Sequence, residues 1–238
     1  MLPRVPDGMD IYLLTESGRT ILALKEKDKT EDTMYAVKND DISDVFAKDG
    51  KKTLKPSFFT VKDYDGAGKF SEKDGIKVKS GIIGQMINSS GKIDGKDYYS
   101  SKSEYSEQNE NNYLNIFKFA SDNSTSEFGM HTYNSNGKKM IQLSTNADEG
   151  AVTAPIGFGI KNSDVINRWH SHPSIRTNPS VEKFSIQGNT GDSDYGHSFY
   201  QKRNYNYIYF PNSSRLYNVT PTTINYIKQI NNHKDLKN

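Results

Sequence analysis

The chain has 238 residues, which is enough for one large domain or two small ones. It contains no cysteine, so disulfides and thiolate metal sites are excluded and a bound metal would need nitrogen and oxygen ligands. The 31 basic and 29 acidic residues give a net charge of +2 without a basic stripe, so we expect no nucleic-acid partner. Hydrophobic residues make up only 33% of the chain, and the 15 tyrosines are expected to supply much of the core.

Residues 1–80 are expected to form a small β-rich segment with a packing or docking role. Its strand-like runs are Asp10–Leu14, Thr20–Lys25, Thr33–Lys38 and Ser57–Lys62. Glu16-Ser17-Gly18-Arg19 is typical of a hairpin turn between the first two runs. The first eight residues lack an apolar stretch, and no run approaches transmembrane length. We therefore expect neither a signal peptide nor a membrane partner.

Residues 81–104 are rich in Gly, Ser and Lys, which predicts a surface linker after a short helix at Ile82–Ile87. The next domain is expected to span residues 105–238. It should begin with a helix at Ser106–Ser121, where apolar residues such as Tyr113 and Phe117 recur at helical spacing. Glu107 lies near the helix start, where the helix dipole favours negative charge.

The remaining pattern predicts a mixture of strands and helices, and therefore an α+β fold class. Expected strands are Ser126–Tyr133, Lys138–Thr145, Asp164–Trp169, Asn206–Phe210 and Arg215–Val219. Expected helices are Asp194–Lys202 and an amphipathic Thr222–Asn232 that carries Ile224, Ile227 and Ile230.

His170-Ser171-His172-Pro173 carries the clearest chemical signal in the chain. Residues i and i+2 of a strand point to the same face, so the two imidazoles can converge on one divalent ion. Two histidines and a carboxylate form a three-ligand site with one position open for water, which is the ligand set of a catalytic zinc. The stretch therefore predicts a hydrolase that uses Zn²⁺.

This stretch resembles the JAB/MPN (JAMM) metalloprotease family. The family pattern has an upstream Glu, then His-x-His-Pro, six residues, a Ser, two residues and an Asp. His170, His172, Pro173 and Ser180 match this spacing. The resemblance implies a mixed sheet flanked by helices, with a layout like that of cytidine deaminases, over roughly residues 105–220.

The third metal ligand departs from the family pattern, because Lys183 occupies the position of the Asp. A longer loop precedes two carboxylates, Asp192 and Asp194, which remain as candidates. Asp194 is favoured because it opens a predicted helix, as the family Asp does. Asp192 could instead cap that helix or orient a ligand. His197 is expected to lie on the helix surface, because a fourth protein ligand would close the site.

The family also requires a general base on a strand that follows a helix. Glu127 fits this position, and Glu149, which lies in a predicted loop, is the competitor. The resemblance implies that Glu127 takes a proton from a metal-activated water and that Ser180 donates a hydrogen bond to the oxyanion. His131 and His233 have no partners in the sequence and are interpreted as structural or solvated.

Within the family, the Asn-Thr-Gly-Asp loop and the Tyr-Ile-Tyr-Phe-Pro-Asn strand resemble JAB-like toxin domains of bacterial Rhs-type polymorphic toxins. This implies a zinc peptidase or isopeptidase with a protein or peptide substrate and a cognate immunity protein. It also implies an effector that is secreted by a signal-peptide-independent route and acts inside a target cell; otherwise the protein is cytoplasmic. The alternative function is a catalytically inert JAB-like scaffold. A deaminase is disfavoured because its zinc site uses cysteines.

Overall fold

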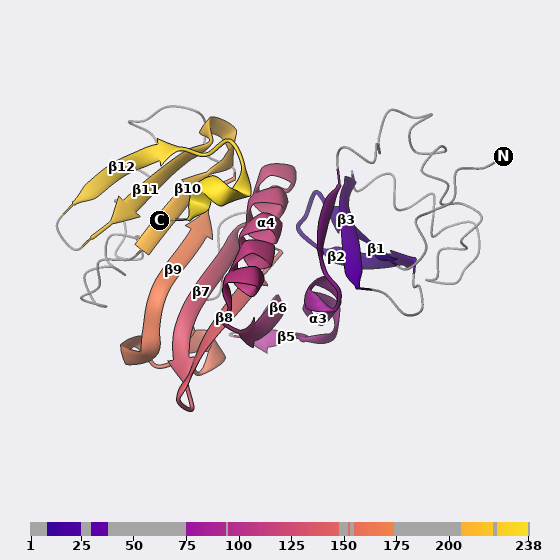
Figure 1. Cartoon of the computed structure of the whole chain (residues 1–238), viewed down its shortest axis with the longest axis horizontal. Helices are drawn as coiled ribbons and strands as arrows, with labels where there is room; N and C mark the ends of the chain where they lie inside the picture. The colour runs from indigo at the N-terminus through magenta and orange to yellow at the C-terminus, as the bar shows by residue number, and fades with distance from the viewer. Residues whose placement is uncertain are drawn as a thin grey trace.

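The computed structural model describes residues 9–24, 30–37, 75–93, 95–147, 152, 155–173, 206–220 and 223–237. Within these ranges two mixed β-sheets pack with two α-helices (Figure 1). This arrangement confirms the predicted α+β class and the β-rich N-terminal segment.

The smaller sheet contains the N-terminal strands in the order β2-β1-β3-β4. Strand β1 pairs in parallel with β3, and the other two pairings are antiparallel. The strand bounds are Met9–Thr15 for β1, Thr20–Leu24 for β2, Glu31–Val37 for β3 and Ile76–Lys79 for β4. Three of the predicted N-terminal strands are thus confirmed, and the fourth, Ser57–Lys62, lies outside the described residues.

The larger sheet has eight strands in the order β12-β11-β10-β9-β7-β8-β6-β5. Only β9 and β10 run parallel among these neighbours. The bounds are Ser90–Ile93 (β5), Lys96–Glu104 (β6), Phe128–Ser135 (β7), Lys138–Thr145 (β8), Val165–Ser171 (β9), Asn206–Phe210 (β10), Arg215–Val219 (β11) and Ile224–Gln229 (β12). Short 3-10 turns are η2 (Pro155–Phe158), η3 (Asn162–Asp164), η4 (Pro211–Ser213) and η5 (His233–Leu236).

Helix α4, Glu107–Asn123, crosses one face of the larger sheet (Figure 1). It begins as the sequence predicts, because the Ser106 hydroxyl accepts a hydrogen bond from the Asn109 amide at 3.1 Å and caps the first turn. Its apolar side, which includes Tyr113 and Phe117, is fully buried. No helix in the described ranges is both long and apolar enough to cross a membrane.

The segment expected to be a surface linker is structured. Residues 81–104 contain the predicted short helix, α3 (Ile82–Asn88), followed by β5 and by β6, which lies inside the larger sheet. Ser100 and Ser101 of β6 are buried, and the Ser101 hydroxyl lies 2.9 Å from the Tyr113 hydroxyl. The linker prediction was wrong here because β6 buries two serines whose hydroxyls find hydrogen-bond partners, although its composition resembles that of a loop.

The predicted terminal helix over Thr222–Asn232 was also wrong, because β12 (Ile224–Gln229) pairs antiparallel with β11. Two isoleucines three residues apart lie on one face of a helix but on opposite faces of a strand. Ile224 packs against the small cluster around Phe210 on one side of the sheet, and Ile227 packs against the main core on the other. Pairing with the edge of β11 therefore partly buries both residues.

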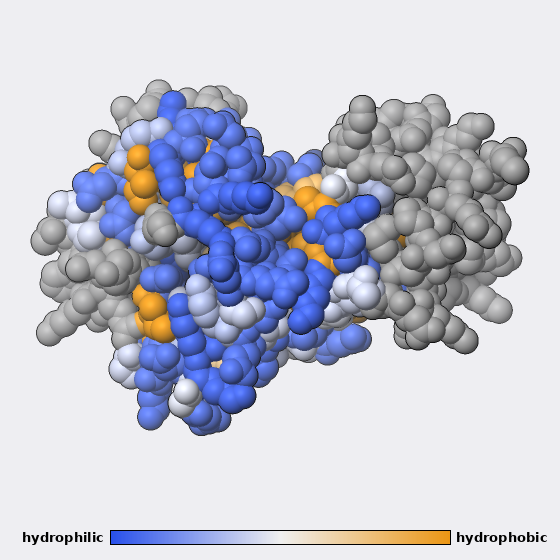
Figure 2. All heavy atoms as spheres, viewed as in Figure 1, coloured by the Kyte–Doolittle hydropathy of each residue, from blue (hydrophilic) through white to orange (hydrophobic). Residues whose placement is uncertain are grey.

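One hydrophobic core joins the two sheets. It contains Tyr12, Leu14 and Met34 of the smaller sheet, Ile83 and Met86 of α3, Phe117 of α4, and Phe128 and Trp169 of the larger sheet. The visible outer surface is mostly hydrophilic and apolar residues form small separate patches (Figure 2). The N-terminal segment is thus packed into the same core as the following region, while the proposed division into domains stays a prediction.

Burial of tyrosine makes stability sensitive to alkali. Burial and the nearby Asp32 carboxylate raise the pKa of Tyr12 to about 12 from its usual 10.0. Because the unfolded chain ionises Tyr12 first, the free energy of unfolding should fall as pH rises from about 10 to 12, by on the order of 1–2 kcal/mol. Urea unfolding should show that the free energy of unfolding falls less between pH 9 and pH 11 in Tyr12→Phe than in the wild type. Tyr226→Phe, at a ring that is 51% exposed, is the control and should lose as much as the wild type. An equal fall in both variants would contradict the prediction.

Candidate metal-binding and catalytic site

Strand β9 delivers the two candidate metal ligands at its carboxyl end. Trp169 packs into the core with α4, so the next residue, His170, faces the opposite side of the sheet, where it is 1% exposed. His172 follows the last strand residue. Its backbone N–H donates to the Tyr209 carbonyl at 2.9 Å, which extends the alignment of β9 with β10. The sheet therefore fixes the backbone of both histidines.

The two imidazoles converge as the His-x-His spacing predicts. The Nε2 atoms of His170 and His172 lie 3.1 Å apart. Two nitrogen ligands of one tetrahedral zinc, each about 2.0–2.1 Å from the ion, are separated by about 3.3–3.4 Å. The arrangement therefore fits two ligands of one ion. The His172 ring also packs on Phe210, with ring centroids 5.2 Å apart, which restricts its rotation.

Glu127 lies beside the histidine pair. Its Oε1 atom is 4.0 Å from His172 Nε2, and the two side chains are 13% and 12% exposed. Glu127 precedes β7 rather than lying within it as the sequence predicted, because β7 begins at Phe128. A carboxylate at this distance is close enough to exchange a proton with a group held by the histidines.

Two hydroxyl side chains hold the backbone around Glu127. The Phe128 N–H donates to Ser171 Oγ at 3.0 Å, and Thr145 Oγ1 donates to the Glu127 carbonyl at 2.8 Å. Ser171 stands between the two histidines in sequence, so it links the ligand strand to the backbone of the residue that follows Glu127. Sequence reasoning missed this role, although the Ser between the histidines was a visible signal.

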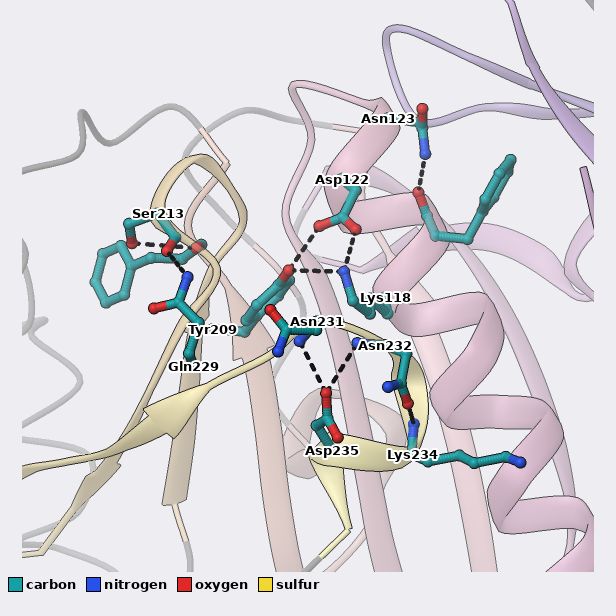
Figure 3. A network of polar contacts seen from close by, with 12 residues as sticks. Lys118, Asp122, Asn123, Tyr209, Ser213, Gln229, Asn231, Asn232, Lys234 and Asp235 are labelled. Carbon is teal, nitrogen blue, oxygen red and sulfur yellow. Dashed lines mark hydrogen bonds and ion pairs between the residues drawn. The ribbon is translucent and has the colours of Figure 1, made fainter. Parts of the chain in front are cut away.

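A polar network on α4 supports the strand beside His172. The Tyr209 hydroxyl donates to Asp122 Oδ1 at 2.7 Å and accepts from Lys118 Nζ at 3.2 Å (Figure 3). Burial, followed by the Asp122 charge, raises the pKa of Tyr209 well above its usual range, so the hydroxyl stays protonated. Because the carbonyl of Tyr209 binds the His172 amide, this network connects α4 to the ligand backbone.

The other predicted site residues, Ser180, Asp192 and Asp194, lie outside the described residues, as do Glu149, Lys183 and His197. Within the described ranges no group of three or more His, Asp or Glu side chains is arranged to hold a metal ion. His131 is fully buried in β7 opposite Arg168, and His233 lies in η5. The structure thus brings together Glu127, His170 and His172 and does not test the remaining assignments.

Comparison with protein-family models matches residues 105–197 to the family described as JAB-like toxin 1. This part of the chain is therefore similar to a JAB-like toxin domain. The matched range begins before α4 and includes β7, β8 and β9, so it contains both histidines and Glu127. It also includes Ser180, Asp192 and Asp194 in the sequence. No curated protein and no solved structure matches the chain.

Proposed function

We propose that the protein is a zinc-dependent peptidase or isopeptidase. The observation that carries this proposal is the convergence of Glu127, His170 and His172 at the end of β9, with contacts of 3.1 and 4.0 Å. Two imidazoles and an adjacent carboxylate are the recurrent parts of a zinc hydrolase. The match to JAB-like toxin 1 supports the same class.

In this proposal His170 and His172 hold the ion together with Asp194, or with Asp192 in its place. When bound, zinc supplies Lewis-acid chemistry, which lowers the pKa of water and polarises a carbonyl. Glu127 takes the proton from the attacking water and passes it to the leaving amine. Ser180 donates a hydrogen bond to the oxygen on which negative charge develops.

The proposed biological role is that of a secreted effector that acts inside a target cell. The description of the matching family as a toxin supports this role. A toxin that hydrolyses proteins or peptides would endanger the cell that makes it, so we propose a cognate immunity protein as a partner. We also propose an Rhs-type delivery route that does not depend on a signal peptide.

Metal analysis tests the site. We expect about one zinc per chain in the wild type after zinc loading and dialysis, and near-zero zinc in His170→Ala, because the loss of one imidazole removes a ligand. His233→Ala, which alters a histidine in the C-terminal η5 turn, should keep the wild-type content. Equal zinc in wild type and His170→Ala, measured by mass spectrometry of the metal, would remove the basis for the site.

Cleavage mapping then addresses the substrate. Bacterial lysate treated with wild-type protein should contain new peptide termini that are absent after treatment with Glu127→Gln. If the zinc-loaded wild type yields no such termini and no released isopeptide-linked fragment, the inert JAB-like scaffold becomes the better description.

A further inference from the structure

The turn of the N-terminal hairpin lies against the segment that leads into Glu127. The Glu16 carbonyl accepts two hydrogen bonds from Thr125, from its N–H at 2.8 Å and its Oγ1 at 3.2 Å. The next carbonyl, of Ser17, accepts one from Ser126 Oγ at 2.8 Å. Three hydrogen bonds therefore join two short segments that are 109 residues apart in the chain.

The two segments also fit closely. Gly18 has a φ of +76°, and a Cβ added to it would lie 2.6 Å from Ser126 Cβ and 2.8 Å from Ser126 Oγ. Real Cβ atoms do not approach so closely, so no larger residue fits here without a shift of Ser126. Glycine is thus required both by the backbone conformation and by the contact.

The turn is a rigid partner rather than a mobile loop end. Its backbone is closed by the Thr15 N–H, which donates to the Arg19 carbonyl at 2.8 Å, and by the Gly18 N–H, which donates to the Thr15 carbonyl at 2.9 Å. The Thr15 hydroxyl accepts a further hydrogen bond from the Arg19 N–H. Strand β1, which leads into the turn, has Leu14 fully buried in the common core.

The contacted segment has no regular secondary structure of its own. Helix α4 ends at Asn123 and β7 begins at Phe128, so Thr125, Ser126 and Glu127 bridge the two elements. The sheet fixes this bridge on one side, through the Phe128 N–H and the Glu127 carbonyl. The N-terminal turn fixes it on the other side, one and two residues before Glu127.

We infer that the Glu16–Gly18 turn is a positioning element for Glu127, so that the N-terminal β-rich segment takes part in catalysis without touching the substrate. This inference rests on the proposed role of Glu127 as the general base. A displacement of about 1 Å at a catalytic group can lower turnover by about 100-fold. Loss of the contact between the turn and Ser126 would therefore lower kcat if it lets Glu127 shift by that much.

The test compares two glycine substitutions with equal backbone cost. Gly18 and Gly137 both lie in hairpin turns at φ +76°, but a Cβ at Gly137 meets nothing within 4 Å. Gly18→Ala should lower kcat by about 10–100-fold on a synthetic peptide that spans a mapped cleavage site, with KM and zinc content unchanged. Gly137→Ala, which has the same backbone strain without the clash, should keep wild-type kcat.

Hydrogen exchange supplies a readout that needs no substrate. The amide of Thr125 should exchange at least about fivefold faster in Gly18→Ala than in Gly137→Ala, because its partner, the Glu16 carbonyl, moves away. Faster exchange of the Phe128 amide, whose partner is Ser171 Oγ, would show that the displacement extends past Glu127. The double variant Gly18→Ala/Ser126→Gly removes both atoms that the new Cβ would strike. Because it also removes the hydroxyl that binds the Ser17 carbonyl, it should recover kcat and protection only to the level of a variant that lacks that hydroxyl alone. If Gly18→Ala does not fold, Ser126→Ala, which removes only the hydroxyl bound to Ser17, should lower kcat by about 3–10-fold.

Equal kcat and equal exchange in Gly18→Ala and Gly137→Ala would overturn the inference and leave the proposed function intact. Absence of zinc binding and cleavage in the wild type would instead refute the proposed function. In that case the exchange rates of Thr125 and Phe128 still decide whether the turn holds the backbone of Glu127.

Discussion

Replacing Glu127 by Gln is expected to lower kcat by about 10²–10⁴-fold, which is the usual contribution of a general base. In the wild type the Glu127 carboxylate lies 4.0 Å from His172 Nε2. The amide of the variant has nearly the same size and keeps one oxygen, but it cannot accept the proton. Zinc content should remain at the wild-type level, because Glu127 is not assigned as a ligand. The measurement is steady-state cleavage of the mapped peptide, together with metal analysis of the same sample.

The matched control for this variant is Glu104→Gln. The Glu104 side chain is 60% exposed on β6 and pairs with Lys138 at 2.6 Å on the surface. Surface pairs of this kind contribute roughly 0–1 kcal/mol, so this variant should keep wild-type kcat and a nearly unchanged Tm. A kcat for Glu127→Gln within about threefold of the wild type would show that another group acts as the base.

Elements with a strong local pattern were predictable from the sequence. Helix α4 follows from a capping serine and apolar residues at helical spacing, and β7 and β8 follow from two runs around a turn. The His170 and His172 rings converge because the strand period is two residues. In these places local preference and tertiary environment favour the same structure.

Elements whose state depends on distant partners were not predictable. Strand β6 has loop-like composition, and its two buried serines find partners only in the folded chain, Ser100 at the Ser89 carbonyl and Ser101 at Tyr113 of α4. The isoleucines of β12 have helical spacing, but the segment forms a strand because it pairs with the edge of β11. Likewise, nothing in the sequence near Glu127 indicates that the turn at Ser17 will contact Ser126, because the contact depends on how the two sheets share a core.

The two candidate aspartates should separate in their effect on zinc affinity. Asn in place of the liganding Asp keeps the shape but removes the charge, so the zinc Kd should rise by more than about 100-fold. Loss of a residue that only orients a ligand typically costs about 10–100-fold. We expect Asp194→Asn to show the larger rise and Asp192→Asn the smaller one. Titration against a zinc chelator of known affinity measures both.

The control is Asp164→Asn, which alters a carboxylate in η3, just before β9 begins and at the opposite end of that strand from His172. Its zinc Kd should stay at the wild-type value.

If both Asp192→Asn and Asp194→Asn keep wild-type zinc affinity, neither supplies the third ligand, and the longer segment after Ser180 does not compensate for Lys183. A larger rise for Asp192→Asn would reverse the order of the two roles and move the ligand out of the predicted Asp194–Lys202 helix. Because β9 fixes only two ligands, the third must come from residues after His172, and a single carboxylate from that stretch would leave the fourth position of a tetrahedral site open to water.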